Sequence, residues 1–309
     1  MFAALSKSFF HTLAGSDAIK RAASRFGMRT EASFARRFIA GETVDEAIAA
    51  ARRIQASGML VTLDYLGESV ASADEAAAAT REYITVIDAI ADAGVERNVS
   101  LKLTQLGLDI DRATTIDNLR RILDRAAPHG FFVRIDMESS DYTERTLDIF
   151  ETLWQQGYRN AGVVIQSYLR RSEADVRRLN ALGARVRLVK GAYKEPREAA
   201  YQSMPEVNAQ FVALMKLLLD EGTYPAIATH DPAMIDATRE HARAHGYAKD
   251  RFEFQMLYGI SRNLQLQLSS EGYPFRVYVP FGREWFPYFM RRLGERPANV
   301  LFVARSLFR

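Results

Sequence analysis

Short runs of β-branched and aromatic residues alternate along most of the chain with longer amphipathic segments. Each run is typical of a buried strand, because it is brief, apolar and followed by a polar turn. The runs that we expect to form strands are Met59–Asp64, Val99–Leu103, Phe132–Asp136, Val163–Gln166, Val186–Val189, Ala226–Thr229, Phe252–Met256 and Val277–Val279.

The segments between these runs have apolar residues at a spacing near 3.6, which predicts amphipathic helices. The main ones are Ala73–Ala93, Thr115–Ala127, Thr143–Gln156, Ala174–Leu182, Pro205–Asp220 and Pro232–His245. Repeated alternation of strand and helix predicts an α/β fold with a parallel sheet. The chain has no G-x-G-x-x-G turn, which disfavours an open dinucleotide-binding sheet. We therefore expect a (β/α)8 TIM-like barrel over residues 56–309, preceded by a helical layer over residues 1–55 in the same domain.

The amino-acid composition excludes several classes of functional site. The 309 residues include no cysteine, which excludes disulfides, thiolate metal sites and Fe–S clusters. No apolar run is long enough to cross a bilayer. The net charge is only +3, so nucleic-acid binding is not expected. The first 29 residues mix basic and apolar side chains; we favour a helix packed on the domain, with a membrane-surface helix as the alternative.

Polar residues gather at the predicted carboxyl ends of the strands, where barrels of this kind carry their active sites. Lys102, Asp136, Lys190 and His230 are examples. Buried polar groups need partners, so their density predicts a site, although Lys102 and Asp136 could also form a structural pair. Either Lys102 or Lys190 could serve as a Schiff-base lysine.

Two further patterns are less specific. Arg291 and Arg292 with Glu295 could clamp a small carboxylate, or could form a solvated ion-pair helix. His241 and His245 are spaced to share a metal ion, but no third ligand is evident in the sequence. We interpret the two histidines as solvated and expect no metal site.

Together these pieces resemble the proline dehydrogenases, specifically the short, single-function bacterial kind. The resemblance extends in family order from the second predicted strand almost to the C-terminus. The matching segments are 101–104, 134–138, 165–171, 187–193, 228–231, 252–257, 276–282 and 291–299.

The resemblance implies an FAD-dependent oxidation of L-proline to Δ1-pyrroline-5-carboxylate, on a distorted barrel whose last helix lies over the strand ends. Asp136 and Arg187 are the implied catalytic residues, with Asp136 orienting Lys102 and the tyrosines or acting as a base. The implied FAD contacts are Met137, Gln166, Arg187, Val189, Lys190, Gly191, Thr229 and His230. The implied substrate contacts are Lys102, Tyr193, Leu257, Tyr278, Arg291 and Arg292, with Glu295 orienting the two arginines.

The resemblance also implies a membrane quinone as electron acceptor. We therefore expect a cytoplasmic location. Peripheral contact with the inner face of the membrane, through the basic N-terminus or the tail Leu301–Arg309, is a hypothesis, and packing of the tail against the barrel is the alternative that we favour. Two other functions stay open: a Schiff-base lyase using Lys190 or Lys102, and a catalytically silent ligand-binding barrel.

Overall fold

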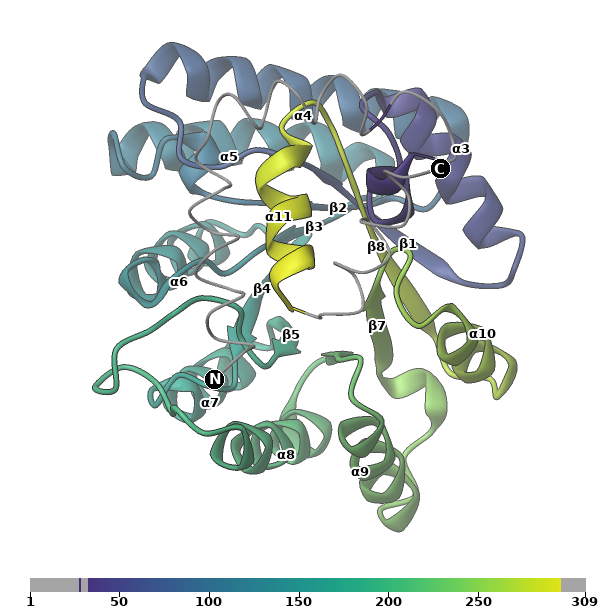
Figure 1. Ribbon diagram of the computed structural model, residues 1–309. Helices are drawn as coiled ribbons and strands as arrows, with labels where there is room; N and C mark the ends of the chain where they lie inside the picture. Colours follow the sequence, from purple (N-terminus) through teal and green to yellow (C-terminus); the bar gives the residue numbers. More distant parts are fainter. Residues whose placement is uncertain (1–27, 29–32, 296–309) are drawn as a thin grey trace.

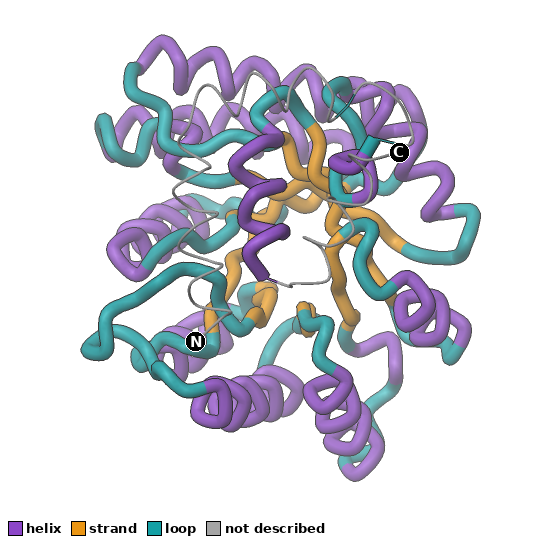
Figure 2. Tube along the Cα trace, viewed as in Figure 1, coloured by secondary structure: helices purple, strands orange, loops and turns teal. Residues whose placement is uncertain are grey.

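The computed structural model describes residue 28 and residues 33–295. Eight parallel strands close into a barrel in the order β1 to β8, and helices surround them (Figures 1 and 2). This confirms the predicted TIM-like fold. The strands are β1 Leu60–Tyr65, β2 Asn98–Leu101, β3 Phe132–Ile135, β4 Ala161–Gln166, β5 Arg185–Val189, β6 Ala226–Ala228, β7 Glu253–Leu257 and β8 Phe275–Phe281.

The helices follow the predicted order, with boundaries set by their caps. They are α3 Val44–Gln55, α4 Ala73–Ala93, α5 Arg112–Ala126, α6 Ser140–Gln155, α7 Ser172–Leu182, α8 Met204–Glu221, α9 Pro232–Ala244, α10 Arg262–Ser270 and α11 Trp285–Glu295. Single 3-10 turns occur at Phe34–Arg37, Thr104–Leu106, Ala127–His129 and Lys249–Arg251. Ser203 forms a capping box with Glu206 at the start of α8, and the side chain of Asp231 caps α9.

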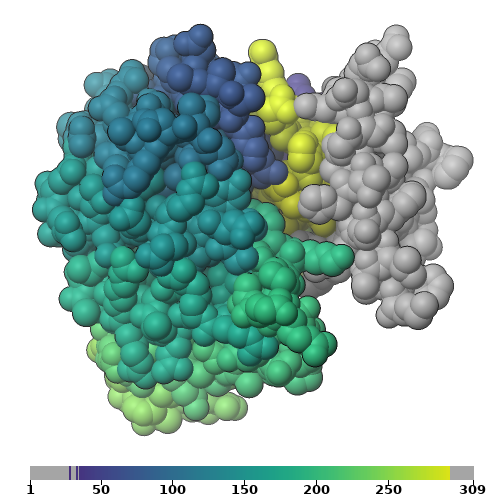
Figure 3. Space-filling model, turned by 90° about the vertical axis from the view of Figure 1, so that its left-hand side faces the viewer, coloured from purple at the N-terminus to yellow at the C-terminus, as the bar shows by residue number. Residues whose placement is uncertain are grey.

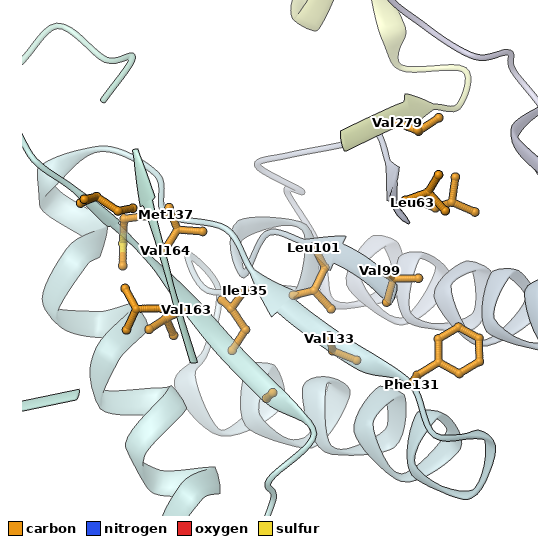
Figure 4. Packing of buried hydrophobic residues seen from close by; sticks show 14 of the residues in the cluster. Leu63, Val99, Leu101, Phe131, Val133, Ile135, Met137, Val163, Val164 and Val279 are labelled. Atoms are coloured by element: carbon orange, nitrogen blue, oxygen red, sulfur yellow. The ribbon is translucent and has the colours of Figure 1, made fainter. Parts of the chain in front are cut away.

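Side chains of each strand alternate between two environments. One set is apolar and packs outward against the helices, as Leu63, Val99, Val133 and Val163 show in Figure 4. The other set points into the barrel, because successive strand residues face opposite sides. This inner set is largely polar. At the carboxyl ends it includes Asp64, Lys102, Asp136, Gln166, Arg187 and Tyr278.

A second group of polar residues fills the opposite, amino-terminal end of the barrel. Arg276 donates from Nε to Glu253 Oε1 (2.8 Å) and from Nη1 to Glu96 Oε1 (2.9 Å). Arg134 donates from Nη1 to the carbonyl oxygen of Arg185 (2.7 Å). These polar residues therefore lie at the end of the barrel away from the predicted site. Their contacts fill this end of the barrel: Arg276 pairs with two carboxylates, and Arg134 Nη1 donates to backbone carbonyl oxygens.

Helix α11 lies across the carboxyl-terminal opening of the barrel (Figure 1), as the resemblance implied. Its apolar residues Trp285, Phe286 and Phe289 form a buried cluster with Phe38 and Ile39, which precede the barrel. Viewed from the side in Figure 3, α11 stands against the rim near α4. The cluster thus joins the last helix to the residues that precede the barrel. The division at residue 55 stays a prediction.

No helix among the described residues has the length and hydropathy needed to cross a bilayer. The basic N-terminal segment and the tail Leu301–Arg309 lie outside the described residues.

Candidate active site

Asp136 is the centre of the hydrogen-bond network at the barrel opening. It follows β3 directly, and each of its carboxylate oxygens has a different partner. Arg187 Nη1 on β5 donates to Oδ1 (2.7 Å), and the Tyr278 hydroxyl on β8 donates to Oδ2 (2.8 Å). Arg187 Nη1 also donates to Ser100 Oγ (3.2 Å), and its guanidinium lies 5.4 Å from the centre of the Tyr278 ring. Asp136 therefore fixes the positions of a cation and an aromatic ring from two other strands.

Lys102 and Asp64 are two buried residues of opposite charge next to this network. Asp64 is completely buried on β1, and neither of its carboxylate oxygens has a hydrogen-bond partner among the described residues. Burial raises the pKa of Asp64 to about 6, against the opposing effect of the Lys102 charge. Burial alone would lower the pKa of Lys102, but nearby carboxylates, Asp64 and Glu68 above all, raise it above its usual value. Lys102 is thus held in its charged form.

Arg291 brings a second cation to the same place from α11. Its Nη1 and Nη2 donate to Glu68 Oε1 (2.7 Å) and Oε2 (3.3 Å), a two-point contact with a carboxylate. Burial would lower the pKa of Arg291, but Glu68 raises it. Lys102, Glu68 and Arg291 line a cleft of about 470 Å³ between the β1–α4 segment and α11. Two cations and one carboxylate therefore line the same cleft.

Aromatic side chains border the charged groups. Burial raises the pKa of Tyr193 to about 12, and it raises the pKa of Tyr278 well above the usual value, so both hydroxyls stay protonated. Leu257 ends β7 beside Tyr278, its register partner on β8. Uncharged side chains therefore lie beside the charged residues of the site.

A separate polar group follows β5 and β6. Lys190 Nζ donates to Asn208 Oδ1 on α8 and to Asp231 Oδ2 at the start of α9, both at 2.6 Å. His230 Nε2 accepts a hydrogen bond from the Leu257 backbone N–H (3.2 Å), and Thr229 Oγ1 accepts one from the Asp231 N–H (3.1 Å). Three consecutive strand ends are linked in this way.

The neighbouring strand ends are linked by backbone contacts. Gln166 Nε2 donates to the carbonyl oxygen of Glu138 (2.8 Å), and the carbonyl of Val189 accepts from the Ser167 N–H (2.7 Å). Met137 is buried beside them. The predicted cofactor residues therefore come from four adjacent strand ends, β3 to β6.

Gly191 passes very close to Tyr168. Its φ is +114°, and a Cβ at this position would lie 2.4 Å from two carbons of the Tyr168 ring. Both the backbone conformation and the lack of space require glycine.

We expect Gly191→Ala to lower the free energy of unfolding by about 3 kcal/mol, from left-handed strain plus the clash with Tyr168. The control is Gly246→Ala, where φ is also positive (+67°) but no atom lies within 4 Å of the added carbon. That variant should lose only about 1 kcal/mol. Urea unfolding of both variants measures the difference, and equal losses would contradict the proposed crowding.

Comparison with known sequences agrees with this geometry. Residues 47–305 match the proline dehydrogenase family profile. The chain belongs to the proline dehydrogenase family. This confirms the predicted enzyme class, an oxidoreductase that acts on proline.

Relatives of this family match nearly the whole chain. Proline dehydrogenase 2 of Bacillus subtilis (strain 168) is 42% identical over 303 residues, covering 98% of this chain and 99% of the relative. Proline dehydrogenase of Deinococcus radiodurans is 40% identical over 281 residues, covering 90% of this chain and 91% of the relative. The match to short, single-function relatives confirms the predicted subfamily.

Solved structures give the same assignment. Proline utilization A (PutA) from Bdellovibrio bacteriovorus, inactivated by N-propargylglycine, superposes with a TM-score of 0.78 at 30% identity. The alignment covers 84% of this chain and 32% of the PutA chain. The chain therefore spans about a third of that bifunctional family member.

The structure gathers the predicted residues of the family's site at one end of the barrel, with two differences. Lys102 does not pair directly with Asp136 among the described residues, because the Asp136 carboxylate accepts hydrogen bonds from Arg187 and Tyr278. The side chain of Glu295, at the end of α11, lies outside the described residues, so its orienting role stays a prediction. Arg292 lies on α11 with its guanidinium 5.2 Å from the Tyr288 ring centre.

Two site residues were missed by the sequence reasoning, Asp64 and Glu68. Asp64 is the only acidic residue in its strand run, and it occupies an inward position of the alternation. That signal was available in the sequence. Glu68 lies in an irregular segment after β1, where no periodicity predicts its direction.

Proposed function

We propose that the protein oxidises L-proline to Δ1-pyrroline-5-carboxylate with bound FAD and passes the electrons to a membrane quinone. The observation that carries the proposal is the two-point contact of Arg291 with the Glu68 carboxylate, beside the charged Lys102. An amino-acid carboxylate can take the place of Glu68 on Arg291 because the two groups have the same shape and charge.

The residues at the opening fit a flavin. Among the described residues, Nε of the buried Arg187 has no hydrogen-bond partner, so an N–H donor is available at the centre of the site. Gly191 allows the backbone to approach a flat group closely, and Lys190 places a cation at the start of α8 and α9. We assign Arg187, Gln166 and Met137 to the ring side, and Lys190, Gly191, Val189, Thr229 and His230 to the remainder of the cofactor.

Bound FAD would supply the electron acceptor for hydride leaving the ring carbon next to the proline nitrogen. The chain's own residues do the rest. Lys102 and Arg291 bind and orient the carboxylate, and Arg292 is assigned to the same group. Tyr193, Leu257 and Tyr278 enclose the ring and limit its size. Asp136 keeps Arg187 and Tyr278 in position, so it acts through them.

The contacts of both lysines oppose the Schiff-base alternative. A Schiff-base lysine must lose its proton to attack a carbonyl. Lys102 is held charged by the surrounding carboxylates, and the Lys190 ammonium donates to Asn208 and Asp231. Both therefore serve better as fixed cations.

The absorption spectrum of the purified protein tests the proposal. We expect a yellow protein whose flavin absorbance is bleached by L-proline without oxygen and restored by a quinone. A colourless protein that is trapped by borohydride with substrate would instead support the lyase. A colourless and inert protein would support the silent binder.

Asp64 gives the site a pH dependence. Its pKa near 6 means that it carries a negative charge above about pH 6 and becomes neutral below it. Loss of that charge leaves Lys102 less neutralised, so affinity for a cyclic carboxylate without an amine should rise about tenfold as the pH falls through 6. Inhibition constants measured between about pH 7.5 and pH 5 check this.

Asp64→Asn is the matched variant, and its inhibition constants should be flat over the same range. The carboxamide of the same cyclic inhibitor is the ligand control. It is uncharged, so its affinity should not depend on the charge of Asp64. A wild-type profile that is flat, or an unchanged slope in Asp64→Asn, would refute the assignment.

We further propose peripheral contact with the inner face of the membrane through one of the two basic, apolar ends. The support is the sequence alone, which mixes cations and apolar residues at both ends. Flotation with anionic vesicles, comparing the full chain with versions lacking residues 1–27 or 301–309, tests this. Equal partitioning of all three would refute it.

A further inference from the structure

Three metal-ligating side chains meet on the outside of the barrel, at the carboxyl-terminal ends of α8 and α9, away from the active-site residues. His241 and His245 lie one turn apart at the end of α9, and Asp220 lies in the last turn of the neighbouring α8. One ligand atom from each of the three side chains lies within 4.8 Å of the others. The third ligand that the sequence did not reveal therefore comes from a different helix.

Contacts with other groups orient the ligand atoms of His245 and Asp220, whereas His241 Nε2 contacts Asp220 itself, and the ion replaces this contact when Nε2 loses its proton. His245 Nδ1 is 2.9 Å from the carbonyl oxygen of His241, which fixes its proton on Nδ1 and leaves the Nε2 lone pair for a metal. A ring nitrogen bonded to a backbone carbonyl is the usual arrangement for a metal-binding histidine. The Tyr247 hydroxyl donates to Asp220 Oδ1 (2.9 Å), and His241 Nε2 lies 2.7 Å from the same oxygen.

The local electrostatics favour a cation. Helices α8 and α9 are consecutive helices of the barrel, so they run parallel and their carboxyl-terminal ends lie together (Figure 1). Each end carries a partial negative charge. The Arg251 guanidinium lies 4.6 Å from the centre of the Tyr247 ring. Arg239 and Arg243 lie two residues from His241, on the opposite side of α9.

We propose that Asp220, His241 and His245 form a binding site for a divalent transition metal ion of the zinc class. Two imidazoles and one carboxylate are the donors that such ions prefer, and water completes a four-coordinate shell. Ligand atoms about 2.0–2.2 Å from a tetrahedral ion lie about 3.4 Å apart. Rotation of the side chains, two of which are exposed at the surface, brings the spacing to this value: His241 Nε2 and Asp220 Oδ1 move apart from 2.7 Å, and ligand atoms up to 4.8 Å apart move closer together.

The ion joins the ends of α8 and α9 that lie away from the active site. At their other ends the two helices are already connected by Lys190, which contacts Asn208 and Asp231. A metal at the carboxyl-terminal ends fixes the pair at both ends. Its role is therefore stabilisation of the α8–α9 wall, and it takes no part in proline oxidation.

Calorimetric titration of the untagged, chelator-treated protein with Zn²⁺ tests the site. We expect one saturable ion per chain, with affinity at least about tenfold weaker in His245→Ala and in Asp220→Asn. His129→Ala is the control, because His129 lies in a 3-10 turn on another side of the barrel and should leave the affinity unchanged. Co²⁺ in place of Zn²⁺ should give the intense visible absorption of a tetrahedral complex.

Thermal unfolding gives a second readout. Zn²⁺ should raise the Tm of the wild-type protein and of His129→Ala by the same amount, because an ion that binds only the folded state stabilises it, and should raise that of His245→Ala less, because its affinity is weaker. His245 is exposed, so its replacement should not impair folding. Absence of saturable Zn²⁺ binding, or equal Zn²⁺ affinity in wild-type and His245→Ala proteins, would overturn the proposal.

Discussion

Replacing Asp136 with asparagine is expected to lower kcat/KM for proline by at least about a hundredfold, equal to about 2.7 kcal/mol of transition-state stabilisation. The amide can accept from only one of the two donors, Arg187 or Tyr278, and presents its own N–H groups to the other. It also leaves the buried Arg187 guanidinium without its neutralising charge. Breaking a buried ion pair in this way should destabilise the fold by about 3 kcal/mol.

Steady-state kinetics with an artificial electron acceptor and urea unfolding measure the two effects. Asp124→Asn is the matched control, because Asp124 also accepts from a tyrosine, Tyr158 (2.8 Å), but at the surface. It should change stability by no more than about 0.5 kcal/mol and leave kcat/KM intact. Wild-type activity in Asp136→Asn would show that Asp136 is not part of the active site.

Replacing Arg291 with methionine is expected to raise KM for proline about a hundredfold while the flavin stays bound. Methionine retains much of the apolar contact but loses the two-point, charged contact with a carboxylate. The flavin should remain, because its assigned contacts lie on β3 to β6 rather than on α11. Kinetics and the flavin absorbance of the purified variant check both parts.

Two variants sharpen this result. Arg177→Met removes a surface arginine paired with Glu173 and should leave KM unchanged. Glu68→Gln removes the carboxylate that occupies Arg291, so a carboxylate inhibitor should bind more tightly to it than to wild type. Flavin loss in Arg291→Met would instead place Arg291 at the cofactor, and weaker inhibitor binding in Glu68→Gln would show that Glu68 supports the ligand rather than competing with it.

The strand pattern predicted the barrel because strand and helix periodicities differ clearly in this chain. It placed most strand boundaries within two residues, and α4 was predicted with its observed bounds, Ala73–Ala93. It missed α10, a short helix with a narrow apolar face. The extent of β8, Phe275–Phe281, was also underestimated, because its inward positions are polar or proline.

Which residues of the site contact one another was harder to predict than which residues belong to the site. Lys102 and Asp136 come from adjacent strands, so their pairing was the natural expectation. The barrel, however, brings Arg187 and Tyr278 across the lumen to Asp136, and linear spacing contains no information on such contacts. The role of Glu68 depends on where an irregular segment meets α11, some 220 residues later in the chain.

The two-sided strands of this barrel have a consequence for redesign. Outward positions such as Leu63, Val99 and Val133 bear the hydrophobic packing, whereas inward positions such as Asp64, Lys102 and Asp136 bear the chemistry. The two sets alternate in the chain and occupy different spaces. Specificity can therefore be engineered by saturating the inward positions near the opening, while the outward ones serve as a constant scaffold. In a deep mutational scan, substitutions at the outward positions should lower mainly the folding yield, and substitutions at the inward positions should lower mainly the turnover. The two sets of positions should alternate along each strand.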